Sequence, residues 1–270
     1  MESLEIILKK YWNYPQFRPQ QLEVIKTILK AEDVLTLLPT GAGKSICFQI
    51  PTLYQNGICV IISPLIALMQ DQVKDLISKN ISAVNLSGDI QQDHQEIIFK
   101  EALAGKYQFI YCSPEKLVQK SFQNFLQALP ITLFAIDEAH CISQWGYDFR
   151  PSYRKLEVLK KMFPSIPILA MTASAIPLVQ QDIIKQLLLK NPSIISSSFL
   201  RPNLSYKVQK LSTKWQGLRH LIENIKGSLI IYCSTRNNVS QLVNILQDYG
   251  YSVGQYHAGM PYITRQEVQD

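Results

Sequence analysis

Short apolar runs alternate with amphipathic segments along most of the chain. In the amphipathic segments apolar residues recur every three or four positions, as Leu22, Ile25, Ile28 and Leu29 do, which predicts helices. The short, mostly apolar runs predict buried strands. The expected strands are Val34–Leu38, Ile58–Ser63, Ala83–Leu86, Phe109–Ser113, Leu133–Ile136 and Ile168–Met171. The expected helices are residues 3–12, 18–30, 46–54, 64–79, 93–104, 115–129 and 153–162.

The order of these elements predicts the fold class. Strand and helix alternate, which is typical of parallel β-α units wound on both faces of one sheet. The carboxyl ends of parallel strands lie at one edge of such a sheet, and ligands bind in the crevice outside that edge. We therefore expect an α/β domain over residues 1–196, with one site at the ends of its strands.

The periodic pattern is interrupted at residues 191–206, NPSIISSSFLRPNLSY. Serines and Asn/Pro pairs are typical of a linker, which we place at residues 197–206. The elements expected after it are helices at 218–225 and 238–249 and strands at Ser228–Tyr232 and Val253–Tyr256. Two strands are fewer than a sheet of this type normally has. Residues 207–270 therefore predict the beginning of a second α/β domain.

A glycine-rich loop connects the first expected strand to the helix after it. Its sequence is Pro39-Thr40-Gly41-Ala42-Gly43-Lys44-Ser45. A strand, a Gly-Lys-Ser loop and a helix form the phosphate-binding P-loop arrangement, in which backbone amides and the helix N-terminus surround the phosphates. Lys44 can then reach the β- and γ-phosphates, and Ser45 can ligate Mg²⁺. Leu38 stands where the longer pattern has a further glycine, so the match is to the shorter TGxGKS form. The alternative is a Gly-rich turn that binds nothing.

The segment Leu133–Tyr153, LFAIDEAHCISQWGYDFRPSY, combines acidic and aromatic chemistry. Its apolar strand ends in two acids, Asp137 and Glu138, where an α/β sheet places metal and catalytic groups. A loop with aromatic residues and an arginine follows, and such side chains can stack on bases and grip phosphate. The segment therefore predicts a hydrolytic centre beside a nucleic-acid sensor. The loop residues are Trp145, Tyr147, Phe149 and Arg150.

Composition agrees with a globular domain and restricts the function classes. The 270 residues are 47% hydrophobic and 18% charged, and no apolar run is long enough to span a bilayer. The N-terminus lacks the features of a secretory signal. The five cysteines show no zinc-ligand spacing, so we expect buried reduced thiols and a cytoplasmic protein, associated with the nucleoid if bacterial. The net charge of +6 is compatible with a polyanionic partner.

Several motifs together resemble the RecQ family of superfamily 2 DNA helicases. In order they are YPQFRPQQ, LPTGAGKS, SPLIALMQDQV, YCSPEKL, DEAHCISQWGYDFRPSY, MTAS, FLRPN, IIYCSTR and YHAG. DEAH or GKS alone would be weak evidence, whereas DEAHCISQWG joined to DFRP and preceded by FRPQQ is specific. The resemblance covers nearly the whole chain. It implies a RecA-like, P-loop NTPase fold for the first lobe, followed by the beginning of a second RecA-like lobe.

The resemblance implies an ATP site with Mg²⁺ as cofactor. Tyr14 and Arg18 would sandwich the adenine, and Gln21 would hydrogen-bond its edge; the alternative for these residues is a proline-bounded turn. Asp137 would hold Mg²⁺ through water, and Glu138 would polarise the water that attacks the γ-phosphate. The alternative for this acid pair is a helix N-terminus that favours negative charge. The remaining nucleotide-binding residues would be Thr40, Gly41, Ala42, Gly43, Lys44 and Ser45.

The resemblance also implies contacts with single-stranded and with forked or duplex DNA. The aromatic-rich loop would couple DNA binding to ATP turnover through His140, Gln144, Trp145, Phe149 and Arg150. A buried core cluster is the alternative for its aromatic rings. The residues expected at the DNA backbone or as γ-phosphate sensors are Ser63, Pro64, Thr172 and Ser174. In the second domain, Arg236 and the segment Tyr256–Gly259 resemble DNA-facing motifs.

The chain differs from the family pattern in several places. The family usually has Phe-Gly in place of Trp12-Asn13, and this replacement affects the entry to the adenine pocket. The other replacements are Tyr147 for His, Ser174 for Thr and Leu200 for Asp. The later motifs, with the arginine finger, the four-cysteine zinc subdomain and the winged helix, are not present. We therefore expect a fragment of a longer protein, with zinc only in the part that is missing.

Three functions are compatible with these observations. The favoured one is the motor of an ATP-dependent 3′–5′ DNA helicase of DNA repair or recombination, with weak or no unwinding by itself. The second is a nucleotide- and DNA-binding module without helicase activity. The third is another superfamily 2 translocase, such as an RNA helicase.

Overall fold

The chain divides into two compact units. The computed structural model describes residues 3–88, 90–146, 148–198, 203–211 and 213–269. The first unit is Met1–Arg201 and the second is Pro202–Asp270. This division falls within the predicted linker, residues 197–206, whose own ends stay a prediction.

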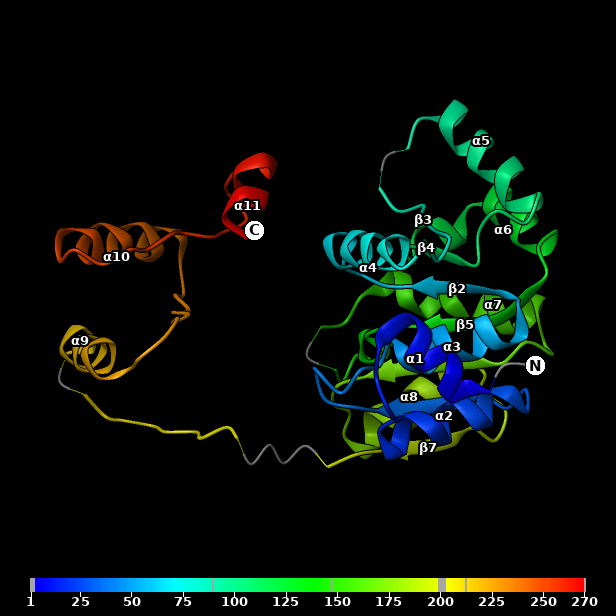
Figure 1. Cartoon of the computed structure of the whole chain (residues 1–270), viewed down its shortest axis with the longest axis horizontal. Helices are drawn as coiled ribbons and strands as arrows, with labels where there is room; N and C mark the ends of the chain where they lie inside the picture. Colours follow the sequence, from blue (N-terminus) through cyan, green and yellow to red (C-terminus); the bar gives the residue numbers. More distant parts are fainter. Residues whose placement is uncertain (1–2, 89, 147, 199–202, 212, 270) are drawn as a thin grey trace. The chain divides into compact units, whose positions relative to one another are not determined.

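A parallel sheet forms the centre of the first unit (Figure 1). Across the described residues its seven strands lie in the order β3-β4-β2-β5-β6-β1-β7, and every recorded pair is parallel. The strands are β1 (Val34–Leu37), β2 (Ile58–Ile62), β3 (Ala83–Asn85), β4 (Phe109–Cys112), β5 (Ile131–Ile136), β6 (Ile168–Thr172) and β7 (Ser193–Ser196). The predicted α/β class with a parallel RecA-like sheet is therefore confirmed.

Helices cover both faces of this sheet because consecutive strand residues point to opposite sides. On one face Cys59 and Leu133 pack with α2, α3 and α4; on the other face Val60 and Phe134 pack with α5, α6, α7 and α8. The α-helices of this unit are α1 (Leu4–Trp12), α2 (Pro19–Leu29), α3 (Ile46–Gln55), α4 (Ile66–Ser78), α5 (Gln92–Leu103), α6 (Lys120–Gln127), α7 (Glu157–Met162) and α8 (Pro177–Gln186). The 3₁₀ helices are η1 (Lys116–Val118), η2 (Ala139–Ile142) and η3 (Pro151–Leu156).

Two elements of this unit were not predicted, α8 and the edge strand β7. In β7 the side chain of Ile195 is buried whereas Ile194 is 51% exposed, so its sequence SIIS lacks a buried apolar run. Pairing along its whole length with β1 compensates, and the hydroxyl of Thr36 also donates to the carbonyl of Ile195 at 3.1 Å. The helix expected at 115–129 consists of η1 and α6, separated by the extended residue Gln119.

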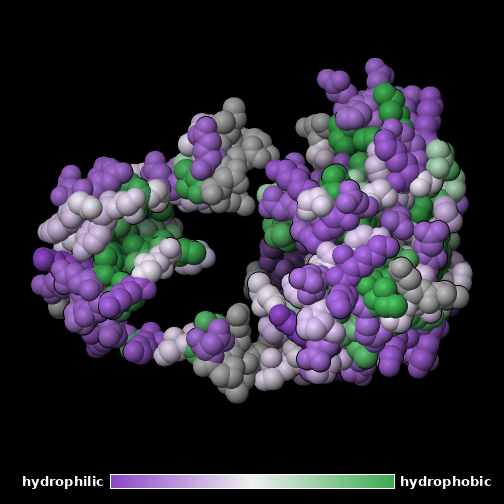
Figure 2. Space-filling model, in the orientation of Figure 1, coloured by the Kyte–Doolittle hydropathy of each residue, from purple (hydrophilic) through white to green (hydrophobic). Residues whose placement is uncertain are grey.

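The described residues of the second unit form helices and no strand. Its helices are α9 (Lys214–Asn224), α10 (Arg236–Asp248) and α11 (Tyr262–Gln269). The strands predicted at Ser228–Tyr232 and Val253–Tyr256 are wrong, because neither segment is a strand in the structure. Two short strands by themselves are marginally stable in water. Apolar residues instead line a hollow of about 1010 Å³, and the unit shows apolar surface in Figure 2.

The described residues contain the reduced thiols that the sequence predicts. All five cysteines are free, and four of them are buried. None of the helices that the structure describes is both long and apolar enough to cross a membrane.

A buried ion pair fixes the amino-terminal edge of the sheet. The ammonium of Lys160 donates to a carboxylate oxygen of Asp33 at 2.7 Å and to the carbonyl of Ile166 at 2.9 Å. The same carboxylate accepts the backbone N–H groups of Ile168 at 2.9 Å and Lys190 at 2.8 Å. One side chain before β1 therefore holds α7, the start of β6 and the segment before β7.

The buried pair predicts that substitutions of the neighbouring residues Lys160 and Lys161 change the free energy of unfolding by very different amounts. Lys160→Met should lower the free energy of unfolding by about 3–5 kcal/mol, because it leaves a buried carboxylate without its cation. Lys161 pairs with Glu157 on the surface, so Lys161→Met should change it by less than about 1 kcal/mol. Urea denaturation measures both. Equal effects of the two substitutions would contradict the importance of the buried pair.

Candidate functional site

The P-loop connects the end of β1 to the start of α3. Gly41 and Gly43 have φ angles of +80° and +78°, which residues with a side chain adopt at a cost. The N–H of Ala42 donates to the carbonyl of Pro39, which closes a turn. Ser45 stands directly before α3, and the ammonium of Lys44 lies 3.4 Å from the carbonyl of Leu38. The loop therefore has the strand–turn–helix geometry that phosphate binding requires.

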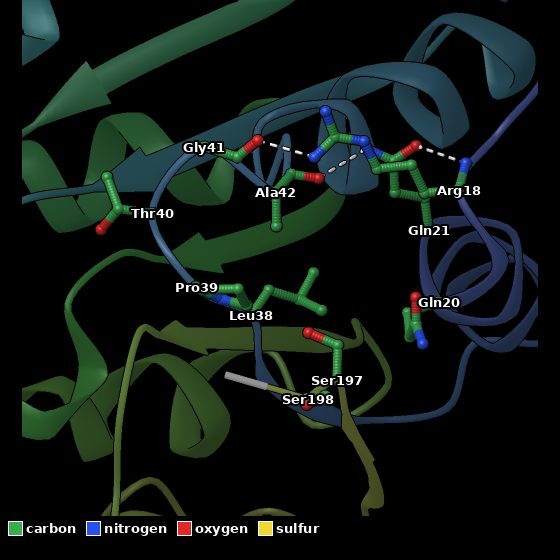
Figure 3. A pocket seen from close by; sticks show the side chains of 10 residues that line it. All are labelled: Arg18, Gln20, Gln21, Leu38, Pro39, Thr40, Gly41, Ala42, Ser197 and Ser198. Carbon is green, nitrogen blue, oxygen red and sulfur yellow. Dashed lines mark hydrogen bonds between the residues drawn. The ribbon is translucent and has the colours of Figure 1, made fainter. Parts of the chain in front are cut away.

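Two residues predicted to bind adenine contact the P-loop in this structure (Figure 3). The guanidinium of Arg18 donates to the carbonyl of Gly41 at 2.6 Å. The amide of Gln21 donates to the carbonyls of Ala42 at 3.0 Å and Gly43 at 3.1 Å, and accepts the N–H of Arg18. These contacts fix α2 against the loop, and Gln21 is nearly buried.

Two pockets adjoin this contact. The pocket in Figure 3, of about 320 Å³, is lined by Arg18, Gln21, the loop and Ser197 and Ser198, which follow β7. Thr40 lines it too, but its side chain points away from Arg18. A second pocket of about 500 Å³ contains Tyr14, which is 55% exposed, together with Arg18, Gln21, Gly43 and Ser45. Sequence reasoning missed the two serines because it assigned them to a linker.

The acid pair lies directly after β5. Asp137 is 8% exposed, and one of its carboxylate oxygens accepts from the hydroxyl of Ser63 at 3.4 Å. Burial raises the pKa of the Asp137 carboxyl, and the neighbouring Glu138 adds to this, whereas Lys44 opposes it. Glu138 has a φ angle of +46°, an uncommon backbone conformation for a residue with a side chain. Strain of this kind is often found at functional sites.

A chain of polar contacts leads from Glu138 to the end of β6. The Nδ1 atom of His140 lies 3.3 Å from the carboxylate of Glu138 and 2.9 Å from the hydroxyl of Thr172. Thr172 in turn donates to the carbonyl of Ser174 at 3.3 Å. Burial lowers the pKa of His140, so its ring is neutral near pH 7. A proton on Nδ1 satisfies both acceptors, which connects the acid to the predicted γ-phosphate sensors.

The aromatic-rich loop continues from His140 and contacts the loop after β2. The guanidinium of Arg150 donates to the carbonyl of Pro64 at 3.2 Å and to the carboxylate of Asp148 at 3.1 Å. Trp145 is 68% exposed, which excludes the buried-core alternative for this ring. The neighbouring Gln144 is also exposed. Tyr147 lies outside the described residues.

Further residues of this loop were not predicted to have a role. The guanidinium carbon of Arg154 lies 5.3 Å from the centre of the half-buried Phe149 ring. The hydroxyl of Tyr153 donates to the carbonyl of Asp137 at 2.9 Å, and this hydrogen bond stabilises the turn that carries the two acids. Asp148 orients Arg150 by accepting a hydrogen bond from its guanidinium. The sequence signal that could have identified this role is the position of an acid two residues before an arginine.

The structure therefore gathers most predicted residues of the first unit at one edge of the sheet. Lys44, Ser63, Asp137 and Thr172 follow or end β1, β2, β5 and β6; Ser63 donates to Asp137, and His140 contacts Thr172. In the second unit Arg236 begins α10 and lies beside Gly259. Leu200 and neighbouring residues of FLRPN lie outside the described residues.

Comparison with known proteins assigns this edge to a family. The model of the DEAD/DEAH box helicases matches residues 18–183, from Arg18, which contacts the P-loop, to a position within α8. The chain belongs to the DEAD/DEAH box helicase family. The match covers the P-loop, the acid pair and the aromatic-rich loop of this chain.

Curated relatives of the chain confirm the predicted resemblance to RecQ. The ATP-dependent DNA helicase RecQ of Haemophilus influenzae is 42% identical over 97% of this chain and 43% of its own length. RecQ of Bacillus subtilis is 39% identical over 100% of this chain and 46% of its own length. A putative ATP-dependent RNA helicase, R290, of Acanthamoeba polyphaga mimivirus is 40% identical over 96% of this chain and 48% of its length. The chain thus spans less than half of each of these relatives.

Solved structures support the fold of the helicase. Lhr of Mycobacterium smegmatis, bound to ssDNA and AMP-PNP, aligns with a TM-score of 0.71 at 15% identity, over 99% of this chain and 39% of that one. The DUF1998 helicase MrfA aligns with a TM-score of 0.71 at 17% identity, over 98% and 43%. Because the identities are only 15% and 17%, these alignments show a common fold and nothing further.

The P-loop glycines predict unequal effects of the same substitution. A methyl group at Gly43 would lie 2.5 Å from the amide nitrogen of Gln21 and displace it, whereas one at Gly41 would meet nothing within 4 Å. Both changes share the cost of a positive φ, about 1–2 kcal/mol. Gly43→Ala should therefore weaken binding of a fluorescent ATP analogue about tenfold more than Gly41→Ala, because the displaced Gln21 side chain no longer lies where it can reach the base. Similar losses would show that the contact with Gln21 is unimportant.

The raised pKa of Asp137 predicts that this carboxylate destabilises the fold. Because the native pKa lies above the unfolded one, the native state binds more protons between the two values, and stability falls as pH rises through them. Asp137→Asn should thus be more stable than the parent chain at about pH 7, with a smaller advantage near pH 4. Thermal unfolding measures this, with the exposed Asp93→Asn as control. An advantage that is independent of pH would contradict the prediction.

Proposed function

We propose that this chain is the ATP-binding motor part of a RecQ-type DNA helicase. It couples hydrolysis of Mg-ATP to 3′–5′ movement on single-stranded DNA, and so to duplex unwinding in repair or recombination. The observation that carries the proposal is the continuous set of contacts through Glu138, His140 and Thr172, with Arg150 joining the same loop to Pro64. Through these contacts a change at the nucleotide can reach the exposed ring of Trp145, and a change at that ring can reach the nucleotide.

The nucleotide side of the site fits a magnesium phosphate. Burial raises the pKa of the Asp137 carboxyl and the charge of Glu138 raises it further, and a bound divalent cation would oppose both effects. Ser45 and Asp137 would hold Mg²⁺, which neutralises phosphate charge when bound. Lys44 would contact the β- and γ-phosphates, and the loop Thr40–Gly43 would offer its backbone amides.

Hydrolysis requires a positioned water and a selective base pocket. Glu138 would orient the water towards the γ-phosphate and hold its proton, while His140 fixes the carboxylate through Nδ1. Tyr14 would stack on the adenine in the 500 Å³ pocket. Arg18 and Gln21 already line this pocket, and they would exchange P-loop carbonyls for the base.

DNA would be sensed by the aromatic-rich loop. Stacking of Trp145 on a base is worth about 1–3 kcal/mol, and its exposure makes it available for that contact. Phe149 and Gln144 would extend the surface, and Ser63 and Pro64 would meet the backbone. Thr172 and Ser174 would transmit the γ-phosphate state towards the second lobe, where Arg236 and Tyr256–Gly259 would face DNA.

An RNA helicase is the second candidate, because one relative of 40% identity carries that name. Competition between single-stranded DNA and RNA of equal length distinguishes the two. Stronger binding of RNA would favour this candidate over the DNA helicase.

The proposal is tested by ATP hydrolysis with and without single-stranded DNA on the chain of residues 1–270. DNA should stimulate turnover in the parent chain, and Lys44→Ala should abolish it because the phosphates lose their cation. Lys30→Ala removes an exposed lysine of the same unit and should retain turnover. Stimulation that survives in Lys44→Ala would refute the nucleotide site. DNA and nucleotide binding without turnover would favour the binding-module alternative.

A further inference from the structure

Three metal-ligating side chains meet in the aromatic-rich loop. The Sγ atom of Cys141 lies 3.8 Å from Nε2 of His140 and 3.7 Å from a carboxylate oxygen of Asp148. One ligand atom from each of the three residues lies within 4.8 Å of the others. A tetrahedral Zn²⁺ ion separates its sulfur and nitrogen ligands by about 3.6 Å, given its usual bond lengths. The observed spacing is therefore close to that of a zinc site.

The surroundings of His140 favour Nε2 as the ligand atom. Its Nδ1 faces the carboxylate of Glu138 and the hydroxyl of Thr172, which together hold the proton on Nδ1. Histidines that ligate metals usually donate their other N–H to such an acceptor, which fixes the ring and increases its basicity. Nε2 is the atom that faces Cys141. The groups that would accept the Nδ1 proton of a metal-bound His140, Glu138 and Thr172, are thus already beside it.

Access is provided by the third residue. Cys141 and His140 are buried, whereas the side chain of Asp148 is 47% exposed. An ion can reach the cluster from solvent along Asp148, and a water can complete the fourth position.

We propose that His140, Cys141 and Asp148 form a regulatory Zn²⁺ site in the aromatic-rich loop. Binding replaces the thiol proton of Cys141 by the metal, so Zn²⁺ and Cys–SH give Zn–S and one released proton, with no change of oxidation state. A cysteine thiol binds a metal only after it has lost its proton. Zinc affinity should consequently rise with pH.

The site lies between the nucleotide and the DNA sensor. Asp148 also accepts the guanidinium of Arg150, so a bound ion competes with Arg150 for that carboxylate. His140 would at the same time be fixed to the loop by a metal bond. On the proposed function, zinc therefore holds the loop in one conformation and reduces the stimulation of ATP hydrolysis by DNA.

Cobalt titration of the chain tests the site independently of activity. Co²⁺ bound by a thiolate in a tetrahedral site gives near-ultraviolet charge-transfer absorption and visible d–d bands. The parent chain should show both, and Zn²⁺ should remove them. Cys141→Ala should show no charge-transfer band, while Cys233→Ala, which removes a cysteine of the second unit, should retain it. Absence of the band in the parent chain, or its persistence in Cys141→Ala, overturns the proposal.

A second variant covers the case that Cys141→Ala does not fold. Asp148→Asn alters a half-exposed side chain and should weaken Zn²⁺ binding at least about tenfold in competition with a chromophoric chelator. Unchanged affinity in Asp148→Asn contradicts the assigned ligand set. Zn²⁺ should also lower DNA-stimulated ATP hydrolysis in the parent chain. If no hydrolysis is found, the proposed function fails, whereas the cobalt spectrum still decides the metal site.

Discussion

The buried carboxylate of Asp33 holds together the half of the sheet on which the site depends. By accepting the ammonium of Lys160 and two backbone N–H groups, it sets where β6 begins relative to β1. The register continues to the other end, where the N–H of Leu38 donates to the carbonyl of Thr172 at 3.1 Å. The P-loop and Thr172 are thus placed next to one another by an interaction at the opposite edge. A parallel sheet covered on both faces transmits that register because its strands are fully packed.

Stability and chemistry oppose each other at the carboxyl edge. Asp137 is a desolvated carboxylate, and Glu138 has an unfavourable backbone angle. The fold supports this turn through Tyr153 and Ser63, whose hydroxyls donate to it. The proposed Mg²⁺ would bind well at such a site because the cost of bringing its negative charges together is met during folding. The acids lie at the end of β5, whose neighbours in the sheet are β2 and β6.

The sequence predicted the first unit well because its signals are local. Apolar runs identify fully buried strands such as β2, and the P-loop and DEAH segments carry their chemistry at fixed spacing. The edge strand β7 was missed because only one of its residues is buried, and its pairing with β1 joins residues far apart in sequence. The strands expected in the second unit were wrong although their sequences are apolar. Among the described residues of that unit, these apolar runs have no neighbouring strand with which to pair. The contacts of Arg18 and Gln21 with the P-loop also could not be predicted, because spacing shows which residues meet only after the chain folds.

The hydrogen bonds of Gln21 have a thermodynamic consequence for the ligand. Its amide makes three contacts, two of them with the loop, which an adenine base would have to replace. On the proposed adenine role of Gln21, the base would bind only while these contacts are released, and the apparent dissociation constant would be the intrinsic one divided by the fraction of that arrangement. Phosphates held by the P-loop would add binding free energy that a base without phosphates lacks. Selectivity for a complete nucleotide can thus arise from a closed resting state as well as from the shape of the pocket.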